Sequence, residues 1–162
     1  MKISRFKDSD NNKTQELDFL EKLNNYFENS IGTNVEKLQN FTKYVPRQDL
    51  INFLARYELF KKILHVLGSI VECGVLFGGG LMAFAQLSAI FEHTNFLRKI
   101  IGFDTFSGFP RLSKHDKSTS KFARKGGFGV NSYEDLKQCI NLYDANRFLD
   151  HYRKLNSSRV ML

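Results

Sequence analysis

The sequence predicts an α/β fold in which a parallel sheet with crossover helices follows a set of N-terminal helices. Three observations support this prediction. Apolar residues recur at helical spacing through residues 14–67, short β-type runs alternate with helical stretches after Gly68, and glycine-rich or polar turns separate these elements. Alternating strands and helices are typical of a parallel sheet, because consecutive parallel strands need a long crossover connection.

The composition suits one globular domain of ordinary size. The chain has 162 residues, of which 42% are hydrophobic, enough for a substantial core. No run of about 18 apolar residues is present, and the polar N-terminus lacks the apolar stretch of a secretory signal. Cys73 and Cys139 are too few for a disulfide framework or a zinc site. We therefore expect a cytoplasmic protein that does not enter a membrane.

The N-terminal part is predicted to be helical. Residues 1–13 are polar and are expected to form a disordered tail, and the first helix covers residues 14–29. A long apolar stripe between Leu50 and Leu67 predicts a core-facing helix that Gly68 ends. Residues 14–67 are therefore treated as an N-terminal helical segment.

Strands and helices alternate through residues 68–162. In chain order the predicted elements are a strand at 69–73, a helix at 81–91, a strand at 99–103, helices at 131–143 and 145–155, and a strand that opens at residue 159. Asn131 or Ser132 would cap the helix that follows, since both side chains accept hydrogen bonds from a first helical turn.

Much of the positive charge lies in one segment. The net charge is +7, and only Asp116 opposes the cations between residues 111 and 125, which are Arg111, Lys114, Lys117, Lys121, Arg124 and Lys125. A solvated surface loop is the ordinary interpretation, and a site for an anionic ligand is the more specific one. We expect this loop to be mobile until an anionic acceptor binds. No zinc finger, RNA-recognition motif or basic zipper is present, so nucleic-acid binding would rest on charge alone.

Two features mark the carboxyl edge of the predicted sheet, where open α/β folds bind their ligands. A glycine-rich turn at residues 72–80 follows the first strand, and Asp104 ends the second. Glycines let a backbone approach a ligand closely, and a carboxylate on the neighbouring strand can accept hydrogen bonds from both hydroxyls of a ribose. Together they predict a site for an adenine nucleoside. A tight strand-to-helix turn that binds no ligand is the alternative.

The spacing of the glycines favours a nucleoside without phosphates. In the dinucleotide fingerprint a second glycine admits the pyrophosphate, and here Leu76 stands at that position. The chain also lacks the glycine-rich pattern of a P-loop. S-adenosylmethionine fits such a turn, because Glu72 and the amides of the turn can meet its amino acid part. A nicotinamide dehydrogenase is disfavoured for the same reason.

These residues resemble one known family. VECGV at residues 71–75, the glycines at 78–80 and IGFDTFSGFP at 101–110 are similar to the macrocin O-methyltransferase family. Its members are class I, S-adenosylmethionine-dependent enzymes that methylate sugar hydroxyls, often on natural products. The resemblance runs from about Phe41 to Leu162 and includes GGFG at residues 126–129.

The resemblance implies roles at the matching positions. Glu72 and Gly74 would border the methionine part of the cofactor, and Asp104 would hold the ribose hydroxyls. The other implied cofactor-binding residues are Gly78, Gly79, Thr105, Phe106, Ser107, Gly108 and Ser132. Tyr44 and Arg47 would form part of a lid over the cofactor or simply pack at the start of a helix.

The resemblance is partial in one respect. Family members continue with further strands and helices that carry the magnesium-binding carboxylates and the general base, whereas this chain ends at Leu162. The implied fold is a Rossmann-like class I methyltransferase fold, truncated after about the third strand, with residues 68–162 as the cofactor-binding half of one incomplete domain. Catalytic residues and metal ligands remain unassigned, magnesium is expected only in the complete enzyme, and no methyl transfer is expected from this half alone.

The sequence therefore predicts an S-adenosylmethionine-dependent O-methyltransferase. Its acceptor would be a small molecule, a sugar hydroxyl of a natural product or of a nucleotide sugar. The alternatives are a non-catalytic, truncated cofactor-binding module and, with less support, a basic nucleic-acid-binding protein. An open strand edge and an uncovered sheet face would favour self-association, so a homo-oligomer is a further expectation.

Overall fold

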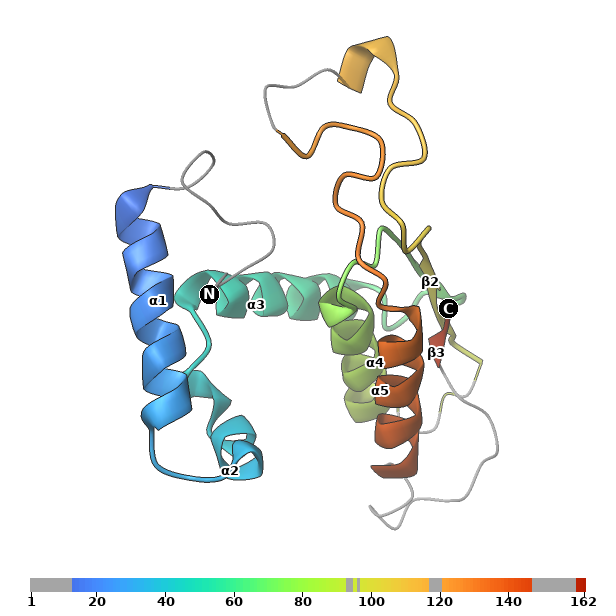
Figure 1. The fold of residues 1–162 in the computed structure, drawn as a ribbon. Coiled ribbons are helices and arrows are strands. Elements are labelled where there is room, and N and C mark those ends of the chain that lie inside the picture. The colour runs from blue at the N-terminus through green and yellow to red at the C-terminus, as the bar shows by residue number, and fades with distance from the viewer. Residues whose placement is uncertain (1–12, 93–94, 96, 117–120, 147–159) are drawn as a thin grey trace. The chain divides into compact units, whose positions relative to one another are not determined.

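The computed structural model describes residues 13–92, 95, 97–116, 121–146 and 160–162 (Figure 1). The chain divides into two compact units, Met1–Ile51 and Asn52–Leu162. The expected tail at residues 1–13 lies outside the described residues except for Lys13, as does most of the helix expected at 145–155. No helix in the described ranges combines the length and the apolar character needed to span a membrane.

The first unit contains α1 (Thr14–Asn29), α2 (Asn34–Gln39) and a 3₁₀ turn (Phe41–Lys43). A capping box starts α2, because Glu36 N–H donates to Thr33 Oγ1 at 3.3 Å and Thr33 N–H donates to Glu36 Oε2 at 2.7 Å. Lys37 is buried, and its ammonium group donates to the carbonyls of Phe27 and Glu28. Carbonyls at a helix end lack intrahelical partners, so Lys37 caps α1 from α2.

Tyr44 has a packing role within this first unit. Its ring lies 5.7 Å from that of Tyr26 and 5.1 Å from that of Phe27, centroid to centroid, and its hydroxyl accepts from Ser30 Oγ at 3.1 Å. Tyr44 is buried by these contacts. Arg47, the other residue considered for a lid, is the exposed first residue of the next helix.

α3 (Arg47–Lys62) is the long helix that the apolar stripe predicted, but it ends six residues before Gly68. The expectation that it faces the core is wrong for most of its apolar side chains, since the described structure buries only Phe60 among them. Phe53 and Leu54 are exposed. Periodicity records which side chains share a face, and it does not record whether a partner covers that face.

The second unit holds a three-stranded parallel sheet in the order β1 (Ile70–Cys73), β2 (Ile100–Phe103) and β3 (Val160–Met161). The register pairs Ile70 with Ile100 and Cys73 with Phe103. α4 (Gly79–Phe91) connects β1 to β2, and α5 (Tyr133–Asn146) lies between β2 and β3 in the chain. The predicted order of strands and helices is confirmed for the described residues, whereas the helix expected at 145–155 is not tested.

The core of this unit lies between the sheet and α4 and α5 (Figure 1). It consists of Val75, Leu81, Met82, Ile100, Leu136 and Ile140. Gly102 on β2 faces this core, and a Cβ there would stand 2.8 Å from Val75 Cγ2, so only glycine lets the α4 layer approach so closely. On the opposite face Val71, Phe103 and Met161 are exposed. In the described residues the helices therefore cover one face of the sheet.

A buried ion pair joins the segments that enter the two long strands. Arg98 and Glu92 are both buried, and Arg98 Nε lies 2.8 Å from Glu92 Oε2. The guanidinium also donates to the carbonyls of Ile63, Val66 and Gly68 at 2.8–3.0 Å. Arg98 thus holds the turn after α3, the end of α4 and the start of β2 together, with its buried charge fully hydrogen-bonded.

We predict that Arg98→Ala destabilises the chain by about 3–5 kcal/mol, because it leaves the Glu92 carboxylate buried and unpaired and frees three backbone carbonyls. Denaturant unfolding followed by circular dichroism measures this change. Lys137→Ala is the control, since its ion pair with Glu134 is exposed and should contribute about 0–1 kcal/mol. Equal effects of the two substitutions would contradict the role given to Arg98.

Candidate functional site

The carboxyl ends of β1 and β2 and the N-terminus of α5 meet at one edge of the second unit. Gly74 N–H donates to Phe103 O at 2.8 Å, which extends the pairing of the two strands by one residue. Beyond that bond the chain turns into α4 on one side and into the loop after Asp104 on the other. This is the edge at which the sequence placed a ligand.

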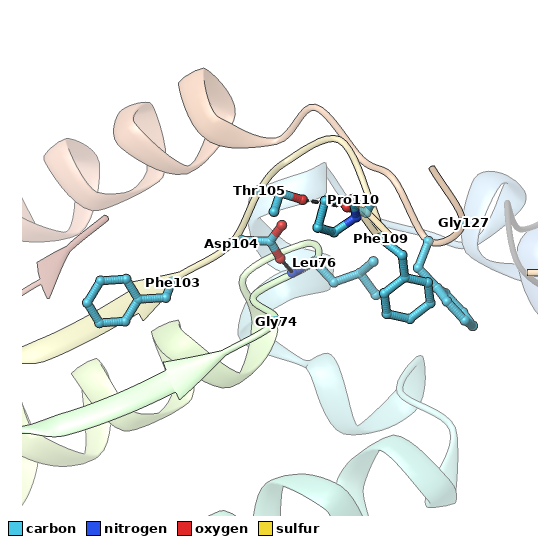
Figure 2. A pocket seen from close by; sticks show the side chains of 10 residues that line it. Gly74, Leu76, Phe103, Asp104, Thr105, Phe109, Pro110 and Gly127 are labelled. Atoms are coloured by element: carbon cyan, nitrogen blue, oxygen red, sulfur yellow. Dashed lines mark hydrogen bonds between the residues drawn. The ribbon is translucent and has the colours of Figure 1, made fainter. Parts of the chain in front are cut away.

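The backbone N–H and carbonyl of Leu76 connect three segments of this edge. Its N–H donates to Asp104 Oδ2 at 3.0 Å, as Figure 2 shows, and its carbonyl accepts from the Ser132 hydroxyl. Leu76 has a φ of 54°, a left-handed conformation that is costly for a side chain of this size. The two hydrogen bonds stabilise that conformation, so the glycine turn, the β2 loop and α5 hold each other in place.

Asp104 is held as an ionised carboxylate. Its second oxygen, Oδ1, accepts from Phe106 N–H at 2.7 Å. Burial raises the pKa of Asp104, but backbone N–H groups, those of Leu76 and Phe106 foremost, outweigh that effect and hold the pKa below the ordinary aspartate value. Each carboxylate oxygen has a further lone pair, so Asp104 can brace the loops and still accept hydrogen bonds from a ligand.

The glycines after β1 allow close packing of neighbouring groups as well as the approach of a ligand. Gly78 has a φ of 84° and precedes α4, and a Cβ there would clash with Leu136 of α5. A Cβ on Gly80 would clash with the carboxylate of Glu72. Gly79, in contrast, has no neighbouring atom within 4 Å of the place where a Cβ would lie. Gly78 and Gly80 therefore let α5 and Glu72 pack against the turn.

Glu72 carries an unsatisfied buried atom. Its Oε2 is inaccessible to solvent and has no hydrogen-bond partner in the described residues. Burial raises the pKa of Glu72, partly offset by the positive charge of Arg56 and by the N–H of Leu81. A buried acceptor without a donor costs free energy. An ammonium group brought to this carboxylate would supply the missing partner, which is the chemistry expected of the amino group of methionine.

An open pocket of about 370 Å³ lies at this edge, large enough for a nucleoside. It is lined by Gly74, Leu76, Phe103, Asp104, Thr105, Gly108, Phe109, Pro110, Gly127 and Phe128 (Figure 2). Most of this lining is apolar or backbone, and among the described residues that form it only Asp104 is charged. An apolar wall with a single anchored acceptor suits a planar base attached to a sugar.

Four of the ten residues proposed from the sequence line the pocket: Gly74, Asp104, Thr105 and Gly108. Of the other six, Glu72, Gly78 and Gly79 belong to β1 or the turn, and Phe106 packs its ring on Tyr133 at 5.3 Å. Ser107 is exposed, and Ser132 is buried with its hydroxyl on Leu76. The structure thus places these six around the pocket and not in its lining.

Sequence reasoning assigned no ligand role to Pro110, Gly127 or Phe128, which also line the pocket. They come from two segments, 105–110 and 126–129, that lie together here. Phe109 N–H donates to Gly127 O at 3.1 Å, and Gly126 N–H donates to Phe109 O at 2.9 Å. The available signal was the presence of both segments in the motifs that resemble the family.

Backbone strain gathers at the same loops. The described non-glycine residues with positive φ are Leu76, Phe106 and Phe128, at 54°, 54° and 56°. Each such conformation costs of order 1–3 kcal/mol and persists only where its surroundings enforce it. Strain of this kind is typical of binding sites.

The described residues do not form a metal site. No group of three or more His, Cys, Asp or Glu side chains in them is placed to hold a metal ion.

The solved structures that are similar to this chain include two of the protein CalS11. One is the crystal structure of CalS11, a calicheamicin methyltransferase, with a TM-score of 0.82, 30% sequence identity and 93% of this chain covered. The other is an apo structure of CalS11, a TDP-rhamnose 3'-O-methyltransferase of calicheamicin biosynthesis, with a TM-score of 0.68, 28% identity and the same coverage.

The matches span only part of those proteins, 58% and 56% of their chains. No protein-family model matches the present chain, and no curated protein matches it. The structural similarity confirms the predicted Rossmann-like methyltransferase fold.

We predict that Glu72→Gln stabilises the ligand-free chain at neutral pH. A carboxyl whose pKa is raised on folding contributes stability below its unfolded pKa and loses that stability as the pH rises through the folded pKa. Chemical denaturation between the ordinary glutamate pKa and neutral pH should show a growing advantage of the variant over wild type. The depressed pKa of Asp104 acts in the opposite direction but is present in both chains, so it cancels. A constant difference across this range would contradict the assignment.

We further predict that Gly108→Ala destabilises the chain by about 1–3 kcal/mol, the cost of forcing a side chain into left-handed backbone. Gly108 has a φ of 85°, and a Cβ there would clash with the carbonyls of Gly126 and Gly127. Gly79→Ala is the matched control, because it meets no atom and begins a helix, where alanine is favoured. Thermal unfolding of both variants measures the difference, and a similar loss in the control would refute the loop-pairing role.

Proposed function

We propose that this chain binds S-adenosylmethionine at the carboxyl edge of β1 and β2 and belongs to an enzyme that methylates a sugar hydroxyl. The supporting observation is the pocket between the glycine turn and Asp104, in a chain 30% identical to a calicheamicin methyltransferase over 93% of its length. The chain spans 58% of that protein, so the activity is proposed for the whole enzyme.

The described residues fit this cofactor. Glu72 has a buried oxygen without a donor, which an amino group would satisfy. Asp104 presents an ionised carboxylate to the pocket, which suits two ribose hydroxyls. Gly74 has no atom within 4 Å of the position of a Cβ, so its backbone is open to a ligand. The apolar walls from Phe109 and Phe128 would receive the adenine.

Each group has a distinct task in this proposal. S-adenosylmethionine supplies the activated methyl group. Asp104 and Thr105 orient the nucleoside, and Glu72 holds the amino acid part, so that the reactive carbon has a fixed position; positioning alone contributes about 7–11 kcal/mol in favourable cases. Ser132 acts indirectly, because its hydroxyl donates a hydrogen bond that fixes the carbonyl of Leu76. It is a positioning residue.

The acceptor is proposed to be a sugar. One similar structure is of a TDP-rhamnose 3'-O-methyltransferase, and the motifs at residues 71–80 and 101–110 resemble the macrocin family of sugar O-methyltransferases. Both indicate a hydroxyl oxygen as the methyl acceptor. Membership of the macrocin family is the more specific part of this proposal.

The test is calorimetric titration of the purified chain with S-adenosylhomocysteine. We expect Asp104→Ala to weaken binding by about 1–3 kcal/mol, the cost of leaving buried polar partners unpaired. Ser132→Ala is the control for indirect effects, since it loosens Leu76 from the other side without removing the carboxylate. Unchanged binding in Asp104→Ala, or an equal loss in both variants, would remove Asp104 from the ligand contacts.

A further inference from the structure

The amino acid part of the proposed cofactor carries two charges, and the groups assigned so far meet one of them. Glu72 offers a buried oxygen to the ammonium group. The carboxylate also needs a partner, because a charge next to apolar walls is costly when it is unpaired. Among the described residues that line the pocket only Asp104 is charged, and its charge is negative. A cation for the carboxylate has to come from outside that lining.

Arg56 is a cation whose charge reaches Glu72. Burial raises the pKa of Glu72, and the positive charge of Arg56 lowers it. Both residues belong to the second compact unit, so their relative placement is part of one folded body. Arg56 is half-buried, although most of its neighbours in α3 are exposed.

The packing of α3 on α4 explains the direction in which Arg56 points. Phe60 is fully buried, and its ring lies 6.3 Å from that of Phe91 in α4, centroid to centroid. Residues four apart share a helix face, so Arg56 lies on the face that carries Phe60. The first turn of α4 in turn lies against Glu72, since a Cβ on Gly80 would clash with the carboxylate. α4 therefore links the two charged side chains.

The guanidinium of Arg56 has most of its donors left for a ligand. Its Nη1 donates to the carbonyl of Asn52 in the same helix at 3.3 Å. The ion pairs of the described residues do not include Arg56, so it does not pair with Glu72 in the ligand-free chain. A guanidinium has five N–H donors, of which the described contacts use one. Two opposite charges that interact without pairing suit a ligand that carries both charges itself.

Open space lies along the turn between the pocket and α4. Gly74 lines the pocket, and neither Gly74 nor Gly79 has an atom within 4 Å of the position that a Cβ would take. Gly79 also begins α4, and a helix N-terminus favours negative charge. A ligand that leaves the pocket along this turn therefore meets an environment suited to a carboxylate.

We propose that Arg56 binds the carboxylate of the amino acid part of the cofactor, while Glu72 binds its ammonium group. This inference rests on the proposed function, since it names a further binding residue for the same cofactor. A guanidinium holds a carboxylate through two parallel N–H···O bonds, which fix orientation as well as charge. The two side chains together select a nucleoside that carries the complete zwitterion.

The experiment is calorimetric titration of the full chain with S-adenosylhomocysteine and with decarboxylated S-adenosylhomocysteine, which keeps the ammonium group and lacks the carboxylate. We expect wild type to bind the decarboxylated ligand about tenfold or more weakly, the effect of losing a charge-assisted pair. Arg56→Gln should bind S-adenosylhomocysteine about tenfold or more weakly than wild type does, and it should bind the decarboxylated ligand equally well. The two losses should therefore not add, as expected of groups in direct contact.

Two further variants separate a direct contact from a general effect of charge or folding. Lys62→Gln removes one positive charge from the exposed end of the same helix and should leave both affinities unchanged. Arg56→Lys should recover part of the affinity for S-adenosylhomocysteine, because it keeps the charge and loses the bidentate geometry. Equal losses for both ligands in Arg56→Gln would overturn the proposal, since they would indicate that Arg56 only supports the packing of α3. Unchanged binding of S-adenosylhomocysteine in Arg56→Gln would also overturn it.

Methylthioadenosine, which lacks the whole amino acid part, separates this inference from the proposed function. It tests the nucleoside pocket alone, and Arg56→Gln should not change its affinity. Binding of methylthioadenosine and S-adenosylhomocysteine with equal affinity to wild type would overturn this inference and leave the proposed function standing. Absence of binding by both ligands would overturn the proposed function, and the role of Arg56 with it.

Discussion

The hydrogen bond between Asp104 and the N–H of Leu76, 3.0 Å long, connects the loops that follow the two long strands. This hydrogen bond stabilises the left-handed conformation of Leu76. Without it we expect the turn to relax and the wall of the pocket to change shape. The Ser132 hydroxyl, just before α5, donates to the carbonyl of the same residue. The pocket therefore depends on one strained residue, Leu76, whose N–H and carbonyl are each held by a side chain.

The strongest stabilising interactions and the candidate site lie at opposite edges of the sheet. At the amino edge, Arg98 and Glu92 form a buried network in which charge and carbonyl groups are satisfied. At the carboxyl edge, positive φ angles and the Glu72 oxygen that has no partner among the described residues store unfavourable free energy. Such a division is expected of a binding fold, because a site must keep polar groups ready for a ligand while the rest of the unit holds it rigid.

The loops around the pocket differ in their chemistry. The wall from Gly74, Leu76 and Asp104 offers a single fixed acceptor in apolar surroundings. The paired segments 105–110 and 126–129 carry the aromatic rings of Phe109 and Phe128.

The sequence by itself determined the order of the described strands and helices and the edge of the sheet at which the candidate site lies. Both follow from local information: strands and helices have different periods, and parallel strands bring their carboxyl ends to one edge. The glycine turn after β1 and Asp104 after β2 could be placed together for that reason, and the structure pairs them directly.

Only the tertiary structure decided which side chains reach the pocket. Phe128 and Gly127 enter it because segment 126–129 pairs with segment 105–110, a contact across many residues that no local period encodes. Phe106 does not line the pocket, because its ring packs on Tyr133. Most apolar side chains of α3 are not buried, because burial depends on a partner that the spacing of residues cannot specify. Long-range contacts depend on the packing and hydrogen bonding of the folded chain, so local sequence patterns do not specify them.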